Sequence, residues 1–225
     1  EVDERLCTGC EQCYLDCPYE AIAMIAANDA RPTLVAHVDP ELCTSCGICA
    51  GSCAPMGVGP PERTGRDQLV RVAAFVSGRE PGPRDVVVIA CGRGAGGLGT
   101  HDTVDGAPVY SVECAGNLHS SVVEVLIRSG AGGVMVVSCP PRDCWNREGP
   151  KWLEARLYHD REAELQPRVD RRRVRLLYAA EGERDAVLAE LREFRVVVEI
   201  LDAAPREREI DLVALCEPSG EAAAS

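Results

Sequence analysis

Two cysteine runs with the same internal spacing lie in the first quarter of the sequence. Residues 7 to 18 are CTGCEQCYLDCP and residues 43 to 55 are CTSCGICAGSCAP, so both contain C-x2-C-x2-C-x3-C. Three thiolates spaced in this way can bind one cubane cluster, and the fourth cysteine of the run then binds the other cluster. The spacing therefore predicts two [4Fe–4S] clusters with crossed ligand sets. The first set is Cys7, Cys10, Cys13 and Cys53. The second set is Cys43, Cys46, Cys49 and Cys17.

Zinc and disulfides are the alternatives for these eight thiols. Zinc sites usually use pairs of cysteines rather than two evenly spaced quartets, and the acidic opening residues do not resemble a secretory signal. Between the runs, residues 21–27 and 32–38 are short apolar segments around a turn at Asn28 and Asp29, which predicts two strands. Over about residues 1–60 the sequence closely resembles a bacterial-type two-cluster ferredoxin.

The composition is that of a folded protein, with 46% hydrophobic and 27% charged residues. The net charge of −12 argues against a nucleic-acid-binding surface, because phosphate binding depends on clustered Lys and Arg. The basic run at residues 171–175 is interpreted as a solvated loop or the start of a strand. Since no segment approaches the ~20 apolar residues of a membrane helix, we expect no membrane span, and oxygen-sensitive clusters favour a reducing cytoplasm.

After residue 84 short apolar strands alternate with amphipathic helices. This alternation predicts an α/β domain with a mostly parallel, flavodoxin/Rossmann-like sheet. The expected strands are residues 86–91, 109–113, 133–138 and 174–178. The expected helices are close to residues 119–130, 150–165 and 183–195. Residues 196–201 form another strand or extend the last helix, and residues 210–216 are a candidate strand.

These patterns divide the chain into four parts. Residues 1–60 are expected to form a two-[4Fe–4S] domain with an α+β ferredoxin-like fold, followed by a Gly/Pro/Arg-rich linker at 61–84 with a helix at 66–76. Residues 85–205 are expected to form the α/β domain, and residues 206–225 a C-terminal strand and tail.

A glycine cluster follows the first strand of the second domain. Gly92, Gly94 and Gly97 fit G-x-G-x-x-G, and Glu113 lies about twenty residues after the first glycine, as in a dinucleotide-binding turn. Such a turn needs a helix directly after the third glycine, but residues 99–109 are polar and lead into the next strand. We therefore interpret the cluster as a glycine-rich loop with another role, with nucleotide binding as the alternative.

Four further cysteines lie at or beyond the ends of the predicted strands. Cys91, Cys114 and Cys139 end the first three strands, and Cys144 follows five residues later in SCPPRDC. Because the carboxyl ends of parallel strands face one crevice, the four thiols predict one metal site, which holds either zinc or a [2Fe–2S] cluster. Cys216 lies outside this pattern and is interpreted as a small buried hydrophobe.

Residues 86–195 resemble the delta subunit of methyl-viologen-reducing hydrogenase, an iron–sulfur protein that links hydrogenases to heterodisulfide reductase. The family's first cysteine pair is C-x2-C, and Gly94 stands at its second position here. Gly149 and Arg156 follow the last cysteine, as in the family, and residues 129–139 and 177–183 also match it. The resemblance implies one [2Fe–2S] cluster on the four cysteines that remain, which are Cys91, Cys114, Cys139 and Cys144.

The resemblance also implies a function. It predicts an electron-transfer subunit between a hydrogenase, a formate dehydrogenase or a similar donor and a heterodisulfide reductase-like flavoprotein. No independent enzymatic activity is expected, because no acid–base pair or activated nucleophile stands out and His101 and His119 are interpreted as loop and helix-start residues. The alternatives are an NAD(P)- or flavin-binding reductase module fed by the ferredoxin domain, and an adaptor with a structural zinc in the second domain.

Overall fold

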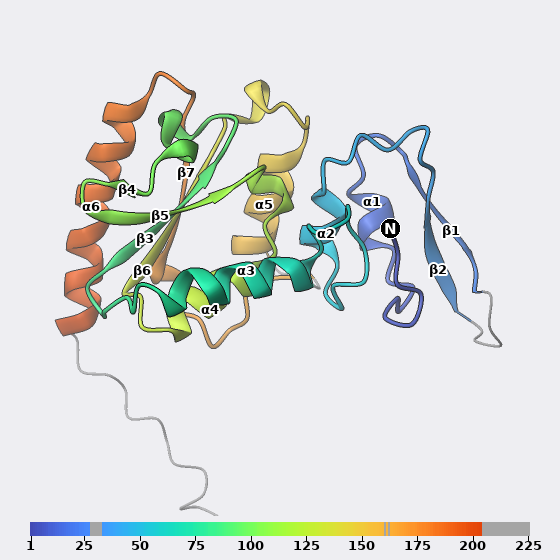
Figure 1. The fold of residues 1–225 in the computed structure, drawn as a ribbon, viewed down its shortest axis with the longest axis horizontal. Coiled ribbons are helices and arrows are strands. Elements are labelled where there is room, and N and C mark those ends of the chain that lie inside the picture. Colours follow the sequence, from blue (N-terminus) through green and yellow to red (C-terminus); the bar gives the residue numbers. More distant parts are fainter. Residues whose placement is uncertain (28–32, 160, 162, 204–225) are drawn as a thin grey trace, which may run out of the picture.

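The structure is a computed structural model that describes residues 1–27, 33–159, 161 and 163–203. A small N-terminal part, which carries both cysteine runs, lies beside a larger part built around a central sheet (Figure 1). None of the helices in these residues is long and apolar enough to cross a membrane.

The N-terminal part contains a two-stranded antiparallel sheet and two short helices. Strand β1 (Ile22–Ala26) pairs with β2 (Leu34–Val38), so the two predicted strands are confirmed. Helix α1 (Gln12–Leu15) lies in the first cysteine run and α2 (Ile48–Ser52) in the second. The predicted turn residues between the strands lie outside the described part of the chain.

Helix α3 (Gly65–Ser77) follows the N-terminal part and extends the predicted helix by one residue at each end. A capping box begins it: the Thr64 side chain accepts from the Asp67 amide, and the Asp67 carboxylate accepts from the Thr64 amide at 2.9 Å. Val72 is fully buried in the main hydrophobic core, and the ring of Phe75 lies 5.1 Å from that of Tyr110. The helix therefore packs against the α/β part of the molecule.

Replacing Thr64 with alanine is expected to destabilise the start of α3 by about 1 kcal/mol, because the N-cap acceptor is lost. Amide hydrogen exchange in the first turn of α3 should then accelerate by about fivefold. Ser77→Ala is the matched control, since Ser77 is an exposed residue at the other end of the same helix. Unchanged exchange in Thr64→Ala would show that tertiary packing alone holds the first turn.

The larger part contains a five-stranded, mostly parallel sheet with the strand order β4-β5-β3-β6-β7. The strands are β3 (Val86–Cys91), β4 (Thr103–Val104), β5 (Ala107–Val112), β6 (Gly133–Ser138) and β7 (Val174–Tyr178). The predicted bounds of β3, β6 and β7 are confirmed, and β5 begins two residues earlier than predicted. The short β4, which pairs antiparallel with β5, was not predicted.

Helices cover both faces of this sheet. Helix α6 (Arg184–Ala203) lies along one side, and α4 (Ser120–Arg128) and α5 (Gly149–Tyr158) lie on the other (Figure 1). Helix α5 ends seven residues earlier than predicted. Residues 196–201 belong to α6, so the helix alternative is confirmed and the strand alternative is wrong. The candidate strand at 210–216 lies outside the described residues.

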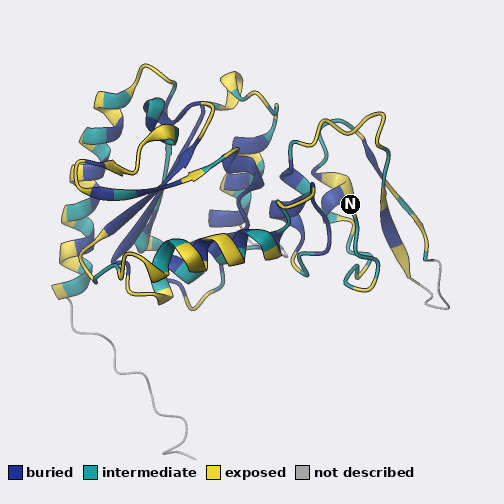
Figure 2. Ribbon diagram, in the orientation of Figure 1, coloured by how far each residue is buried: buried dark blue, intermediate teal, exposed yellow. Residues whose placement is uncertain are grey.

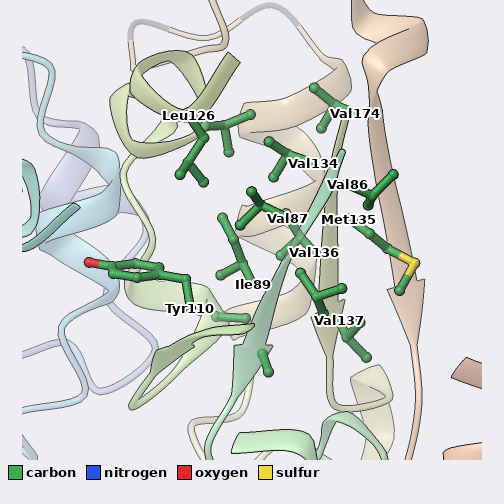
Figure 3. Close-up of a cluster of buried hydrophobic side chains, with 14 of the residues drawn as sticks. Val86, Val87, Ile89, Tyr110, Leu126, Val134, Met135, Val136, Val137 and Val174 are labelled. Atoms are coloured by element: carbon green, nitrogen blue, oxygen red, sulfur yellow. The ribbon is translucent and has the colours of Figure 1, made fainter. Parts of the chain in front are cut away.

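The core lies where these helices meet the sheet. Every residue of β3 and β6 is buried, as expected for parallel strands that are covered on both faces (Figure 2). Valine side chains of both strands meet Ile89, Leu126 and Tyr110 in one cluster (Figure 3). This rigid sheet fixes the positions at which the strand-end cysteines leave it.

Candidate metal centres

The eight cysteines of the two runs line two separate cavities in the N-terminal part. The larger cavity, of about 450 Å³, is lined by Cys17, Cys43, Cys46 and Cys49. The smaller cavity is lined by Cys7, Cys10, Cys13 and Cys53. Each cavity therefore collects three cysteines of one run and the last cysteine of the other, which is the grouping of the two predicted ligand sets. That these thiols bind clusters stays a prediction.

The backbone turns in the same way within both runs. Gly9 and Ser45 stand at the same place in their runs and have φ of 74° and 57°. Glu11 and Gly47 then precede the short helices α1 and α2 with φ of 65° and 78°. Left-handed residues at these points reverse the chain between cysteines. The matching pairs give the two runs the same local course, as their identical spacing predicts.

Backbone amides point at the sulfur atoms. The amide of Ala21 donates to Cys17 Sγ at 3.4 Å, and the amide of Gly57 donates to Cys53 Sγ at 3.2 Å. Both donors stand four residues after the cysteine, so the last thiol of each run is held alike. Such N–H···S bonds raise the reduction potential of a cluster by stabilising negative charge on sulfur.

The described cysteines are free thiols, and burial disfavours the charged form of four of those in the two runs. Burial, followed by the neighbouring thiols of Cys53 and Cys10, raises the pKa of Cys13 to about 12. Burial also raises the pKa of Cys46, Cys49 and Cys53. Because metals bind thiolates, iron must displace protons from these sulfurs. Buried thiols that lie in groups are costly to ionise in the absence of a cation. Such groups fit a cationic metal centre, which stabilises the thiolates.

The four cysteines of the second part come together at the carboxyl edge of the sheet. Cys91 ends β3, Cys139 follows β6, and Cys114 precedes the short 3-10 helix η2 (Ala115–Asn117) that follows β5. Cys144 lies after another 3-10 turn, η3 (Pro141–Asp143). Three of these thiols are buried, and Cys144 is half-buried. Because the strand order reverses around β3, this edge is where open α/β sheets bind ligands.

Mutual interactions join these four thiols into a closed ring, which we call the thiol ring. Cys91 and Cys144 each interact with both Cys114 and Cys139. These interactions lower the pKa of Cys91 and Cys144, while they raise the pKa of Cys114 and Cys139. The structure thus brings together all four residues that the sequence places at strand ends.

Glycines allow the backbone to close around the thiol ring. A Cβ at Gly94 would lie 2.9 Å from the Cβ of Cys139, so Gly94 packs directly against a ring member. A Cβ at Gly149 would lie 3.2 Å from Cys144 Sγ and 3.6 Å from Cys114 Sγ. Both glycines therefore leave room for the ring's own atoms.

The glycine cluster does not open an α-helix. Residues Ala95–Thr100 form 3-10 turns (η1), with Gly96 and Gly97 in the left-handed region, and the chain then enters β4. Glu113, the residue at the ribose-binding distance, forms an ion pair with Arg63. The predicted lack of a helix after the glycines is confirmed, and a dinucleotide site gains no support.

Residues that follow Cys114 contact the N-terminal part. Asn117 Nδ2 donates to the carbonyl of Gly47 at 2.8 Å. His119 is the N-cap residue of α4, in line with its interpretation as a helix-start residue, and burial lowers its pKa to about 4, so its ring is neutral. Its Nδ1 accepts from the Ser121 amide, which leaves Nε2 to donate to the carbonyl of Cys53 at 3.2 Å. No pattern in the sequence indicates this contact between the two parts.

Arg156 and Asp16 are two more buried residues at this boundary. Arg156 Nη1 donates to Ser52 Oγ at 3.2 Å, and Ser52 Oγ donates to Asp16 Oδ2 at 2.6 Å. Burial lowers the pKa of Arg156 to about 10, which leaves its guanidinium charged at neutral pH. Sequence reasoning noted Arg156 only through the family resemblance. An arginine one turn after the buried Leu153, on an otherwise apolar helix face, was the available signal.

Comparison with protein families follows the same division of the chain. Residues 6–57 match the family described as 4Fe-4S dicluster domain, and this range contains all eight cysteines of the two runs. Residues 97–202 match the family described as methyl-viologen-reducing hydrogenase, delta subunit. This second range includes Cys114, Cys139 and Cys144 of the thiol ring. No curated protein matches the chain. The chain is therefore similar to a 4Fe-4S dicluster domain over residues 6–57 and, after it, to the methyl-viologen-reducing hydrogenase delta subunit family over residues 97–202.

Proposed function

We propose that this protein is an electron-transfer subunit that holds two [4Fe–4S] clusters and one [2Fe–2S] cluster. The observation that carries the proposal is the grouping of its described cysteines into three sets of four. Two sets line separate cavities, and the third is the thiol ring. When bound, such clusters supply one-electron transfer at low potential. The protein's residues supply ligands, N–H···S bonds and a buried setting.

The proposed ligands follow these sets. One [4Fe–4S] cluster takes Cys7, Cys10, Cys13 and Cys53, and the other takes Cys43, Cys46, Cys49 and Cys17. The [2Fe–2S] cluster takes Cys91, Cys114, Cys139 and Cys144. The repeated turns of the two runs support a ferredoxin-like fold for residues 1–60. Numbered among themselves, the four parallel strands have the order 2-1-3-4, which supports a flavodoxin-like sheet in residues 85–205.

The family match supports partners for this subunit. The proposed donor is a hydrogenase, a formate dehydrogenase or a similar enzyme, and the proposed acceptor is a heterodisulfide reductase-like flavoprotein. The chain's net charge of −12 favours docking onto basic patches of such partners. Low-potential iron–sulfur clusters are oxygen-sensitive and need a reducing compartment, so we place the complex in the cytoplasm.

A structural zinc at the thiol ring is the second candidate. One zinc ion would need four sulfur atoms at about 2.3 Å from a single point. Four thiols that lie close to one another fit either one zinc ion or a [2Fe–2S] cluster. The match of residues 97–202 to the hydrogenase delta subunit family is the observation that favours the cluster.

Metal analysis of the whole chain, purified without oxygen, separates the two candidates. We expect about ten irons per chain and no zinc, because two cubanes hold four irons each and the thiol ring holds two. Cys114→Ala is expected to retain about eight irons and to lose the [2Fe–2S] signal in electron paramagnetic resonance (EPR) of the reduced protein. About eight irons with one zinc in the unmodified chain would contradict the relay role of the second domain.

A further inference from the structure

Arg156 lies where the two domains meet and is the one lysine or arginine buried among the described residues, with 1% of its surface exposed. Its guanidinium reaches in two directions. Nη1 donates to Ser52 Oγ at 3.2 Å, and Nη2 donates to the carbonyl of Gly116 at 2.7 Å. Ser52 directly precedes Cys53 of one N-terminal set, and Gly116 stands two residues after Cys114 of the thiol ring.

The contact continues toward the second N-terminal set. Ser52 Oγ donates to Asp16 Oδ2 at 2.6 Å, and Asp16 directly precedes Cys17. Arg161 Nη2 donates to the other oxygen of the Asp16 carboxylate at 2.8 Å. One chain of hydrogen bonds thus touches the neighbours of a proposed ligand from all three clusters. We call Arg156, Ser52, Asp16 and Arg161 the interface network.

The interface network carries excess positive charge. Two guanidinium groups face one carboxylate, and among the described residues the Nε of Arg156 finds no hydrogen-bond acceptor. A buried cation without a full set of partners is costly unless other negative charge lies nearby. Arg156 Nη2 donates to the carbonyl of Gly116, two residues after Cys114, which places this charge beside the thiol ring. The unmatched charge therefore points to an anionic group at the thiol ring.

The backbone is shaped to admit this side chain. A Cβ at Gly51 would lie 2.7 Å from Nη2 and 2.8 Å from Cζ of Arg156. The guanidinium is thus packed against helix α2 of the N-terminal domain, although it belongs to α5 of the second domain. Because only 1% of the surface of Arg156 is exposed, solvent screens its charge only weakly.

We infer that Arg156 is a positioning residue that sets the reduction potentials of the clusters on the two sides of the domain boundary. The inference rests on the proposed function. Electron transfer across the boundary moves one electron, and no bond forms or breaks. A cluster with four thiolate ligands is anionic and gains one more negative charge on reduction. A fixed positive charge beside it stabilises the reduced form and raises its potential.

Redox titration of the whole chain, reduced stepwise with dithionite and followed by EPR, tests this role. Arg156→Gln should lower the potential of the thiol-ring cluster, so that the reduced-to-oxidised ratio at a fixed solution potential falls at least tenfold, or about 59 mV for one electron. A smaller shift in the same direction is expected for the [4Fe–4S] clusters. Arg156→Lys keeps the charge and should restore most of the potential.

Two further variants separate charge from structure. Lys151→Gln removes the same charge from an exposed position of the same helix and should leave all potentials unchanged, because solvent screens it. Ser52→Ala breaks the bridge to Asp16 but keeps the guanidinium, and it should preserve the potential of the thiol-ring cluster. If Arg156→Gln lost the thiol-ring cluster, its potential could not be measured in that variant. A wild-type potential of the thiol-ring cluster in Arg156→Lys would then support the inference, because lysine keeps the positive charge.

Three results would overturn the inference. The first is an Arg156→Gln variant with its clusters intact and its potentials unchanged. The second is a shift in Ser52→Ala as large as that in Arg156→Gln, which would make the effect one of packing. The third is loss of the thiol-ring cluster in both Arg156 variants. If the wild-type chain held no cluster at the thiol ring, the proposed function would be refuted as well. Metal analysis of the wild-type chain shows this outcome before any variant is made.

Discussion

Replacing Cys53 with alanine is expected to remove the same [4Fe–4S] cluster as replacing Cys13, although the two cysteines belong to different runs. Cys53 lines the cavity of Cys7, Cys10 and Cys13 rather than the cavity of its own run. Each single substitution should lower the iron content by about four, since a cubane holds four irons. Iron analysis, together with the EPR spectrum of the reduced protein, measures the loss.

Two double variants with equal numbers of cysteines make the test decisive. Cys13→Ala with Cys53→Ala should lose only about four irons, because both positions serve one cluster. Cys13→Ala with Cys17→Ala should lose about eight, because these neighbours in one run serve different clusters. The reverse pattern, with the larger loss in the first pair, would show that each run binds its own cluster.

The cysteine grouping was predictable because spacing along the chain limits which thiols can reach one cluster. The strands β3 and β6 were predictable because each is a short apolar segment rich in β-branched residues. Strand β7 was predictable because it is a short, mostly apolar segment. Parallel strands that are buried on both faces leave such uninterrupted segments in the sequence. Their carboxyl ends then place Cys91 and Cys139 side by side, so the thiol ring followed from the strands.

The end of α6 shows where local preference fails. Residues 196–201 are VVVEIL, which has strong strand propensity, yet they are helical. Leu191, Phe194 and Val198 are fully buried and recur at helical spacing along α6. Packing of this apolar face over the sheet outweighs the strand preference of the valines, because propensity differences amount to only about 1 kcal/mol per residue. The short β4 and the 3-10 turns depend on local hydrogen bonds that leave no periodic pattern.

The interface network was beyond sequence reasoning because it depends on how two domains pack. Ser52 and Arg156 are separated by 104 positions, and although Ser52 stands inside the second cysteine run, nothing in the spacing of that run points to Arg156. In the sequence, glycines at the contact positions were the sign that the two domains approach closely. A Cβ at Gly47 would lie 2.1 Å from Asn117 Nδ2, so the glycine is needed for close packing as well as for its left-handed turn. From the sequence alone, the turn between cysteines is a sufficient reason for Gly47. Its role in the packing of the two domains is visible only in the folded structure.

Adding a single methyl group at Gly116 is expected to abolish the thiol-ring cluster and to spare both [4Fe–4S] clusters. A Cβ at Gly116 would lie 2.4 Å from Gly149 Cα, and backbone at that distance cannot yield as a flexible side chain does. Gly116→Ala must therefore push η2 away from the start of α5. Cys114 leads into η2, and its thiol contacts Cys144, so the displacement opens the thiol ring. Overpacking of this kind costs about 1–3 kcal/mol.

Gly182→Ala is the matched control, because a Cβ at Gly182 would meet no atom within 4 Å. We expect the control to keep about ten irons and Gly116→Ala to keep about eight, with the EPR signals of the [4Fe–4S] clusters unchanged in both. Retained [4Fe–4S] signals would show that the N-terminal domain is folded, so the loss cannot be general unfolding. An intact [2Fe–2S] signal in Gly116→Ala would contradict the close contact of η2 with α5 as the support of the thiol ring. Because the same displacement moves the Gly116 carbonyl away from Arg156, a variant that retained part of its [2Fe–2S] cluster should also show a lowered potential.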